Sequence, residues 1–219
     1  MKNQASPATE WVQLAGQFAR DNKQTSFLLK RMKAHDIFIY EHSLREAYYS
    51  LLLAQGLGLS GKEQEVLYRS ALLMDIGKLR VTYKVEANLD ESGTPSILMH
   101  PQYSADILKP FIDRGLVDGE AVLQHHENLD GTGYPYYRTW EDITLNARIL
   151  RVADSFAAAT SYDKRKGTVL GIEAALDELY RWSDMMYDAD LVNMLCHYYG
   201  AEIKKDKPEK TSTLRLINH

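Results

Sequence analysis

Histidines and acids suited to binding a metal ion are concentrated in two short segments of the chain. Residues 124–135 read QHHENLDGTGYP, in which His125 and His126 precede an Asp-Gly turn. Residues 72–78 read LLMDIGK, in which Asp75 interrupts an apolar run. A buried carboxylate is costly unless it is hydrogen-bonded, paired or bound to a metal. The two segments therefore predict a mixed nitrogen and oxygen metal site, of the kind that suits iron, manganese, nickel or zinc.

Three further residues could join this site. His42 and His100 stand at predicted helix ends or turns, and Asp154 lies in a second apolar run. Each has a simpler explanation, because a lone histidine at a helix start is usually a cap or a surface residue, and Asp154 could accept hydrogen bonds from a helix N-terminus. The adjacent histidines are the stronger signal. Consecutive helical residues point about 100° apart, so both reach one ion only at a helix end, which the Asp-Gly turn supplies.

The elements that must position these residues are expected to be helices. Apolar residues recur three and four apart along most of the chain and alternating runs are few, which predicts an all-α protein. Ser60 is the expected N-cap of one helix, and the Gly and Pro content predicts a turn at 128–135 and a loop at 81–99. The expected helices cover residues 9–34 (one or two helices), 43–55, 62–74, 101–114, 118–126, 144–161, 169–182 and 188–200.

Composition narrows the class of protein. The chain has 219 residues, 45% of them hydrophobic, which is enough for one domain with its own core. Its 26 basic and 30 acidic residues leave no basic surplus for a long nucleic acid. A single cysteine, Cys196, agrees with a reducing compartment. The polar start and the lack of an apolar run of about 18 residues predict a cytoplasmic protein with no membrane segment.

The order of the motifs resembles the HD-GYP family, a branch of the HD metal-dependent phosphohydrolases. The matching segments are HSLREA (42–47), LLMDIGKLRV (72–81), HPQYSADIL (100–108), HHENLDGTGYP (125–135), NARILRVADSFAAATS (146–161) and YDADLV (187–192). The resemblance implies a helical bundle of the HD-GYP type at residues 36–203, with an N-terminal helical extension at 1–35 and a charged tail at 204–219. It also implies hydrolysis of a cyclic dinucleotide, cyclic di-GMP before any other, to a linear product.

The resemblance implies roles for individual residues as well. One metal ion would be held by His42, Asp75 and Asp154. A second would be held by Asp75, His100, His125 and His126. Asp75 would bridge the two ions and, with Lys78, carry the catalysis. The expected cofactors are one or two divalent or mixed-valence ions per chain, iron or manganese. The implied substrate-binding residues are Lys78, Gly131, Gly133, Tyr134, Pro135 and Arg165.

The chain departs from the family pattern at several positions. Met74 stands where the family's His-Asp pair has its histidine, and a thioether binds hard iron or manganese ions poorly. The first ion is therefore expected to keep at most three protein ligands. Phe38 stands one turn before His42, where members with three ions carry an acid, so no third ion is expected. Ala157 replaces a usual aspartate, and residues 162–167 (YDKRKG) lack the usual Asp-Arg-Pro-Tyr-Arg but keep positive charge. The pair His35-Asp36 is interpreted as a surface pair.

Three functions remain open at this point. The first is a metal-dependent cyclic-dinucleotide phosphodiesterase. The second is a catalytically impaired HD-GYP-like domain that binds the nucleotide or a signalling protein partner. The third, ranked last, is a di-iron oxygenase. The six retained ligands favour the first function.

Overall fold

The computed structural model describes residues 23–81, 96–161 and 169–201. Within these ranges the chain is helical and forms no strand, apart from isolated bridges between Asp130 and Thr139 and between Ser183 and Tyr187. The α-helices are α2 (Lys23–His35), α3 (Ile37–Gly56), α4 (Gly61–Leu73), α5 (His100–Ile112), α6 (Gly119–Gln124), α7 (Leu145–Thr160), α8 (Ile172–Arg181) and α9 (Ala189–Tyr198). Short 3-10 turns are η1 (Ile76–Arg80), η3 (Ser96–Met99) and η4 (Trp140–Asp142). The all-α prediction is confirmed.

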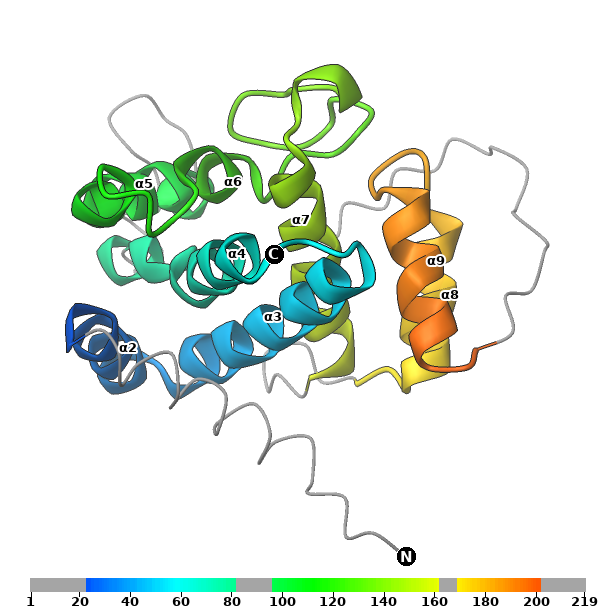
Figure 1. Ribbon diagram of the computed structural model, residues 1–219, viewed down its shortest axis with the longest axis horizontal. Coiled ribbons are helices and arrows are strands. Elements are labelled where there is room, and N and C mark those ends of the chain that lie inside the picture. Colours follow the sequence, from blue (N-terminus) through cyan, green and yellow to red (C-terminus); the bar gives the residue numbers. More distant parts are fainter. Residues whose placement is uncertain (1–22, 82–95, 162–168, 202–219) are drawn as a thin grey trace, which may run out of the picture.

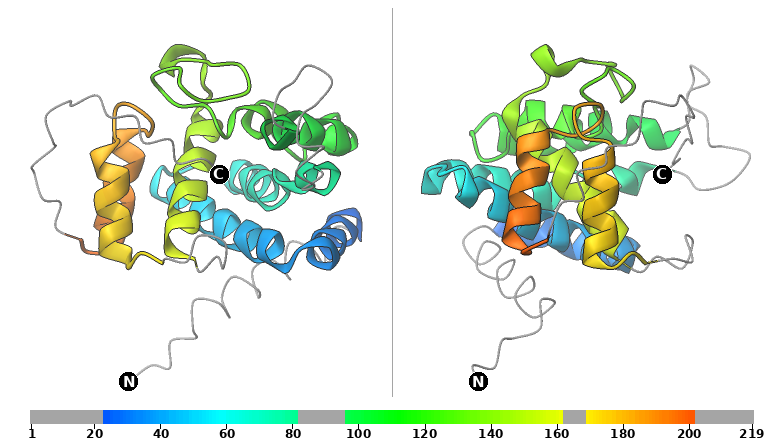
Figure 2. Two further views of the ribbon diagram at one scale, coloured as in Figure 1. Left: turned by 180° about the vertical axis from the view of Figure 1, so that it is seen from behind. Right: turned by 90° about the vertical axis from the view of Figure 1, so that its right-hand side faces the viewer.

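The helices are arranged in layers (Figure 1). α3 packs against α4 and α7, and α6 in turn contacts α4, α5 and α7. The pair α8–α9 lies on the side of α7 opposite α4, α5 and α6, as the left view in Figure 2 also shows. α7 is thus the central element, since it contacts α3, α6, α8 and α9. None of the helices within the described ranges is both long and apolar enough to span a lipid bilayer.

The core lies where α3, α4 and α7 meet. Leu53, Tyr68 and Phe156 are almost wholly buried, and the rings of Tyr49 and Phe156 pack edge to face with centroids 4.8 Å apart. Burying a large apolar side chain contributes roughly 1.5–3 kcal/mol. This core fixes the relative positions of the three helices, which carry or adjoin three of the predicted ligands, His42, Asp75 and Asp154.

Most predicted helices agree with the structure to within a few residues, and Ser60 caps α4 in a capping box with Glu63. One start was wrong. The helix expected at 43–55 begins at Ile37, because the carboxylate of Asp36 accepts a hydrogen bond from the backbone N–H of Phe38 at 2.7 Å and caps it. Asp36 is therefore an N-cap and not merely a surface residue. Residues 9–22 and 82–95, and the tail from residue 202, lie outside the described part of the chain.

Candidate metal centre

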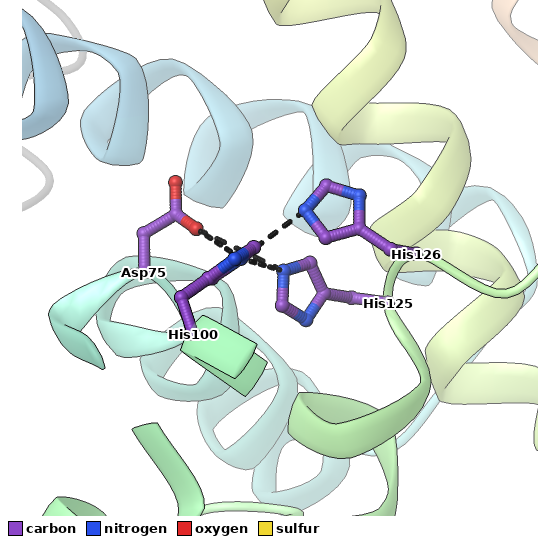
Figure 3. Close-up of side chains that lie close together, drawn as sticks. All are labelled: Asp75, His100, His125 and His126. Atoms are coloured by element: carbon purple, nitrogen blue, oxygen red, sulfur yellow. Dashed lines mark hydrogen bonds and ion pairs between the residues drawn. The ribbon is translucent and has the colours of Figure 1, made fainter. Parts of the chain in front are cut away.

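Four of the predicted ligands meet in the interior of the molecule (Figure 3). Each offers one ligand atom, and these four atoms lie within 4.8 Å of one another. Asp75 comes from the junction of α4 and η1, His100 is the first residue of α5, and His125 and His126 directly follow α6. All four residues are buried. We refer to them as the histidine-rich cluster.

The protons of two of these histidines point away from the centre of the cluster. Nδ1 of His100 lies 2.6 Å from the carbonyl oxygen of Ile97, and Nδ1 of His125 lies 2.6 Å from that of Val122. Because a carbonyl oxygen can only accept, each Nδ1 carries the proton, and a neutral ring then has its lone pair on Nε2. These two Nε2 atoms are 3.1 Å apart, and Nε2 of His126 is 3.2 Å from that of His100. Lone pairs so close repel unless a cation lies between them, so the residues fit a metal ion.

Three residues of the cluster are in the deprotonated forms that metal binding requires. Burial lowers the pKa of His100 to about 4, although the nearby Asp75 opposes this. Burial lowers the pKa of His126 well below its ordinary value. Burial disfavours the charged form of Asp75, but the ammonium of Lys78 and the contacts with the histidines hold the pKa of that carboxyl well below its usual range. At neutral pH, His100 and His126 are therefore neutral imidazoles and Asp75 is a carboxylate.

The position of Asp75 depends on a close approach between η1 and α5. A Cβ atom on Gly77 would lie 2.2 Å from the carbonyl oxygen of His100 and 2.6 Å from the backbone nitrogen of Ser104. In its absence, the Gly77 N–H donates to Ser104 Oγ at 2.8 Å. Glycine thus allows η1 to pack on the first turn of α5, which places Asp75 Oδ1 3.1 Å from His100 Nε2.

The loop after α6 folds back onto the adjacent histidines. A Cβ atom on Gly133 would lie 2.5 Å from the carbonyl oxygen of His126, and Gly131 has a φ of +78°, which glycine adopts without strain. The ring of Tyr134, which precedes Pro135 across a cis peptide bond, stacks on the ring of His126 with centroids 4.7 Å apart. Gly133 and Tyr134 thus lie against His126. The role of all four loop residues in substrate binding stays a prediction.

Glu127, the third residue of the HHE segment, holds this loop. Its buried carboxylate accepts hydrogen bonds from the backbone N–H groups of Tyr136 at 2.7 Å and Arg138 at 3.0 Å. Both carboxylate oxygens are used in this way. The acid in the motif therefore shapes the loop and is not one of the residues that face the cluster.

His42 lies at a second position beside the cluster. Its Nε2 atom is 3.0 Å from Oδ1 of Asp154 and 2.7 Å from Oε1 of Glu46. The other oxygen of Asp154 lies 3.6 Å from Nδ1 of His126, so the two positions adjoin. Burial lowers the pKa of His42, but the charge of Glu46 and the hydrogen bond to Asp154 outweigh it and raise that pKa to about 10. Asp154 is held from its own helix, since Arg151 Nη1 lies 3.8 Å from its Oδ2.

Sequence reasoning missed Glu46. This residue is fully buried, and its carboxylate lies within 4.8 Å of ligand atoms of both His42 and Asp75. Burial raises its pKa to about 8 against the pull of His42, and the charge of Asp75 acts in the same direction as burial. The signal that could have found it is its spacing, because residues four apart share one face of a helix and Glu46 follows His42 by four.

Lys78 is paired with the cluster. Its Nζ atom lies 2.6 Å from Oδ2 of Asp75, the oxygen that faces away from the histidines. Burial lowers the pKa of Lys78, but the charges of Asp75, Glu46 and Asp154 outweigh it and raise that pKa above its ordinary value. Lys78 therefore keeps its positive charge at physiological pH.

The three positions that depart from the family pattern differ in burial and in the helix that carries them. Met74 is the C-cap of α4 and is fully buried, as is Ala157 in α7, while Phe38 is partly buried in the first turn of α3. The sequence placed His42 at the start of a helix, but the residue lies inside α3. Arg165 lies outside the described residues, as do its basic neighbours Lys164 and Lys166.

Comparison with known proteins decides the family. Residues 26–191 match the family model of the HD domain, which is most of the chain. The chain belongs to the HD-domain family. This agrees with the HD-GYP resemblance found from the motifs.

Individual relatives are consistent with that assignment. The chain is 38% identical over 126 residues to the 3′3′-cGAMP-specific phosphodiesterase 3 of Vibrio cholerae, which covers 55% of this chain and 26% of that protein. It is 33% identical over 155 residues to a cyclic di-GMP phosphodiesterase response regulator of Xanthomonas campestris, with coverage of 69% and 41%. The chain thus spans less than half the length of either relative.

A solved structure supports the HD-domain fold. The crystal structure of a cyclic GMP-AMP specific phosphodiesterase from V. cholerae superposes with a TM-score of 0.60 at 19% identity. The match covers 79% of this chain and 47% of that one. The helical HD-domain bundle predicted from the sequence is therefore confirmed.

Proposed function

We propose that this chain is a metal-dependent phosphodiesterase that opens a cyclic dinucleotide, cyclic di-GMP in the first place, to a linear product. The observation that carries the proposal is the histidine-rich cluster, in which imidazole lone pairs and a carboxylate converge on one point. The names of two relatives support the substrate class, since one is a 3′3′-cGAMP-specific phosphodiesterase and the other a cyclic di-GMP phosphodiesterase response regulator. Iron or manganese suits the mixture of imidazole and carboxylate ligands.

The chemistry divides between the ions and the chain. Bound ions would supply Lewis acidity and lower the pKa of a water molecule. In the hydrolysis a water oxygen forms a bond to phosphorus, one ester P–O bond breaks, and the leaving ribose oxygen takes up a proton. Lys78, whose side chain is 19% exposed, would bind a phosphoryl oxygen and stabilise the charge that develops there. Asp75 orients Lys78 through their 2.6 Å ion pair.

The loop after α6 and one basic segment would hold the rest of the substrate. Gly131, Gly133, Tyr134 and Pro135 would form the wall of the pocket next to His126. Arg165 would contact the second phosphate. These contacts would place one phosphodiester over the cluster, and the positioning alone contributes to the rate.

The test is metal analysis combined with hydrolysis. Protein purified without oxygen should contain one or two ions per chain and should convert cyclic di-GMP to a linear product when iron(II) or manganese(II) is added; 3′3′-cGAMP is assayed in parallel. His125→Ala should lose the ion of the cluster and at least about 100-fold in rate, because each ligand is needed to hold the metal. His197→Ala, at an exposed position of α9, is the matched control and should change neither quantity. Unchanged metal content in His125→Ala would contradict the proposed site.

A second candidate function has one observation in its favour. Met74 is buried where the family's motif has a histidine, so the chain could bind the nucleotide without cutting it, as a module read by a signalling protein partner. Bound but intact nucleotide, with ions added in excess, would favour this candidate. A linear product would exclude it.

A further inference from the structure

Glu46 is a buried acid to which the HD-GYP resemblance gives no role. It has no exposed surface, and it projects from α3 one turn after His42. Within the described part of the chain, neither of its oxygens makes a hydrogen bond of normal geometry. A buried carboxylate without donors is unfavourable unless a cation compensates it. The surroundings of Glu46 should therefore indicate which cation that is.

Its neighbours are two further acids and a single imidazole. Oε1 of Glu46 lies 2.7 Å from Nε2 of His42, and the same nitrogen lies 3.0 Å from Oδ1 of Asp154. The ligand atoms of Glu46, His42 and Asp75 lie within 4.8 Å of one another. Two ligands at right angles on one ion, each about 2.1 Å from it, are about 3 Å apart. The observed separations of 2.7 and 3.0 Å are of that size.

We propose that Glu46 is a metal ligand, and that it builds an oxygen-rich ion position together with His42, Asp75 and Asp154. Asp75 then lies between this position and the histidine-rich cluster. The inference deepens the proposed function and rests on its metal dependence. Glu46 supplies the fourth protein ligand that the sequence, with Met74 in place of a histidine, did not provide.

The two positions differ in chemistry. The histidine-rich cluster offers three nitrogens and one carboxylate, whereas the oxygen-rich position offers one nitrogen and three carboxylates. Carboxylates favour harder ions such as manganese(II) or magnesium, and imidazoles favour ions further along the first transition row. The oxygen-rich position should therefore prefer manganese(II) over zinc to a greater degree than the cluster does.

A structural explanation of Glu46 competes with this one. Glu46 could simply form an ion pair with a protonated His42, while Lys78, 2.6 Å from Asp75 Oδ2, neutralises the remaining charge. In that arrangement the chain would bind a single ion. The two explanations differ in the number of ions bound and in what happens when the charge of Glu46 is removed.

The experiment compares wild type with Glu46→Gln, which keeps the shape of the side chain and removes its charge. Both proteins are stripped with a chelator and reloaded with manganese(II), and bound manganese is counted by elemental analysis and electron paramagnetic resonance. We expect about two ions per chain in the wild type and about one in Glu46→Gln, with the affinity for the lost ion reduced at least about tenfold to a hundredfold. Glu41→Gln, an exposed acid of the same helix, is the control and should retain both ions.

Thermal unfolding with and without metal separates a ligand from a structural ion pair. If Glu46 is a ligand, the rise in Tm on adding manganese(II) should be smaller in Glu46→Gln than in the wild type, because the variant binds one ion fewer. If Glu46 serves only an ion pair with His42, the metal-free variant should be less stable than metal-free wild type, but manganese(II) should raise the Tm of both proteins equally. Should Glu46→Gln fail to fold, Glu46→Asp keeps the charge and shortens the side chain by one methylene, and it should weaken only the second ion.

A rescue variant adds an independent readout. Met74→His introduced into Glu46→Gln should restore the second ion, since residue 74 directly precedes Asp75 at the end of α4. Equal ion counts in wild type and Glu46→Gln, whether one or two, would overturn the inference. None of these readouts uses a nucleotide, so an inactive protein that still loses one ion with Glu46→Gln would refute the proposed function and leave the role of Glu46 standing.

Discussion

The histidines of the site fall into two groups according to the residues that surround them. His100 and His126 have lowered pKa values because burial disfavours their charged forms. His42 is also buried, but Glu46 and Asp154 raise its pKa to about 10. The same side chain is therefore neutral in the histidine-rich cluster and protonated at the oxygen-rich position. An ion that enters the oxygen-rich position must displace protons, whereas one that enters the histidine-rich cluster need not.

This difference predicts unequal pH dependence for the two ions. Between about pH 6 and pH 8, affinity at the oxygen-rich position should rise about tenfold to a hundredfold per pH unit, because His42 and Glu46 have pKa values of about 10 and 8 and must lose their protons. Affinity at the cluster should change little, since the pKa of His100 is about 4. Calorimetric titration with manganese(II) in buffers of different ionisation enthalpy measures the protons released with each ion.

The stability of the metal-free protein depends on pH in the opposite direction: it falls as the pH rises. The raised pKa of His42 contributes stability that is fully present below its ordinary value of 6.5 and is lost as the pH rises towards 10. Raising the pH thus destabilises the empty oxygen-rich position and favours its filling. Two ions with the same pH slope would contradict the assignment of His42 and Glu46 to one ion.

The sequence suggested six candidate metal ligands but did not suggest Glu46. The candidate ligands were recognisable because their motifs follow in a fixed order, and four of them meet in one cluster. Glu46 was missed because the resemblance gives it no role, although it lies within the matching segment HSLREA, and because its importance depends on which face of α3 is buried. The predicted limit of three protein ligands for the ion of His42, Asp75 and Asp154 followed from Met74 alone. A replacement ligand from another helix was not considered.

At the scale of elements, the contact between η1 and α5 joins two segments of the site. Asp75 directly precedes η1, and His100 begins α5. The two approach closely because residue 77 has no side chain. The glycine of the motif Asp-Ile-Gly-Lys therefore has a steric role in this chain, independent of any ligand.

Gly77→Ala tests that reason. Its Cβ would lie 2.2 Å from a backbone oxygen of α5, so η1 must shift, and overpacking of this kind costs typically about 1–3 kcal/mol. Because Asp75 moves with η1, ion binding should weaken as well. Urea unfolding of the metal-free protein and a manganese titration measure the two effects. Gly61→Ala, in the first turn of α4 with nothing within 4 Å, should be neutral or slightly stabilising. Equal behaviour of the two variants would show that the close approach is not needed.

Helix identity was predictable from apolar periodicity, whereas one helix start was not. The N-terminus of α3 depends on the side chain of Asp36, which had been set aside as part of a surface pair. That cap extends α3 by a turn and a half relative to the predicted start, and so His42 became an interior residue of the helix. Local capping decided this position, and no hydrophobic pattern reports on it.

For the whole molecule, the site acts as a junction. Its candidate ligands come from α3, from the α4–η1 junction, from the start of α5, from the end of α6 and from α7. The α8–α9 pair contributes none, and Figure 1 shows it on the far side of α7. An ion bound by these ligands links segments that lie up to 112 residues apart along the chain, and the unfolded chain cannot hold those ligands together.

Metal binding should therefore stabilise the fold by mass action, and unevenly across it. Manganese(II) at about 100 times its dissociation constant contributes about 2.7 kcal/mol for each ion. For a domain of this size that corresponds to a rise in Tm of roughly 5–11 °C. Differential scanning calorimetry with and without a chelator measures the shift.

The stabilisation should be confined to the helices that hold ligands. Hydrogen exchange should slow at the start of α5, at the end of α6, and in α3 and α7. Local opening of α8 and α9 should be unaffected, because these two helices hold no ligand. Protection spread equally over α8 and α9 would mean that the ions act through the whole bundle and not through the ligating helices.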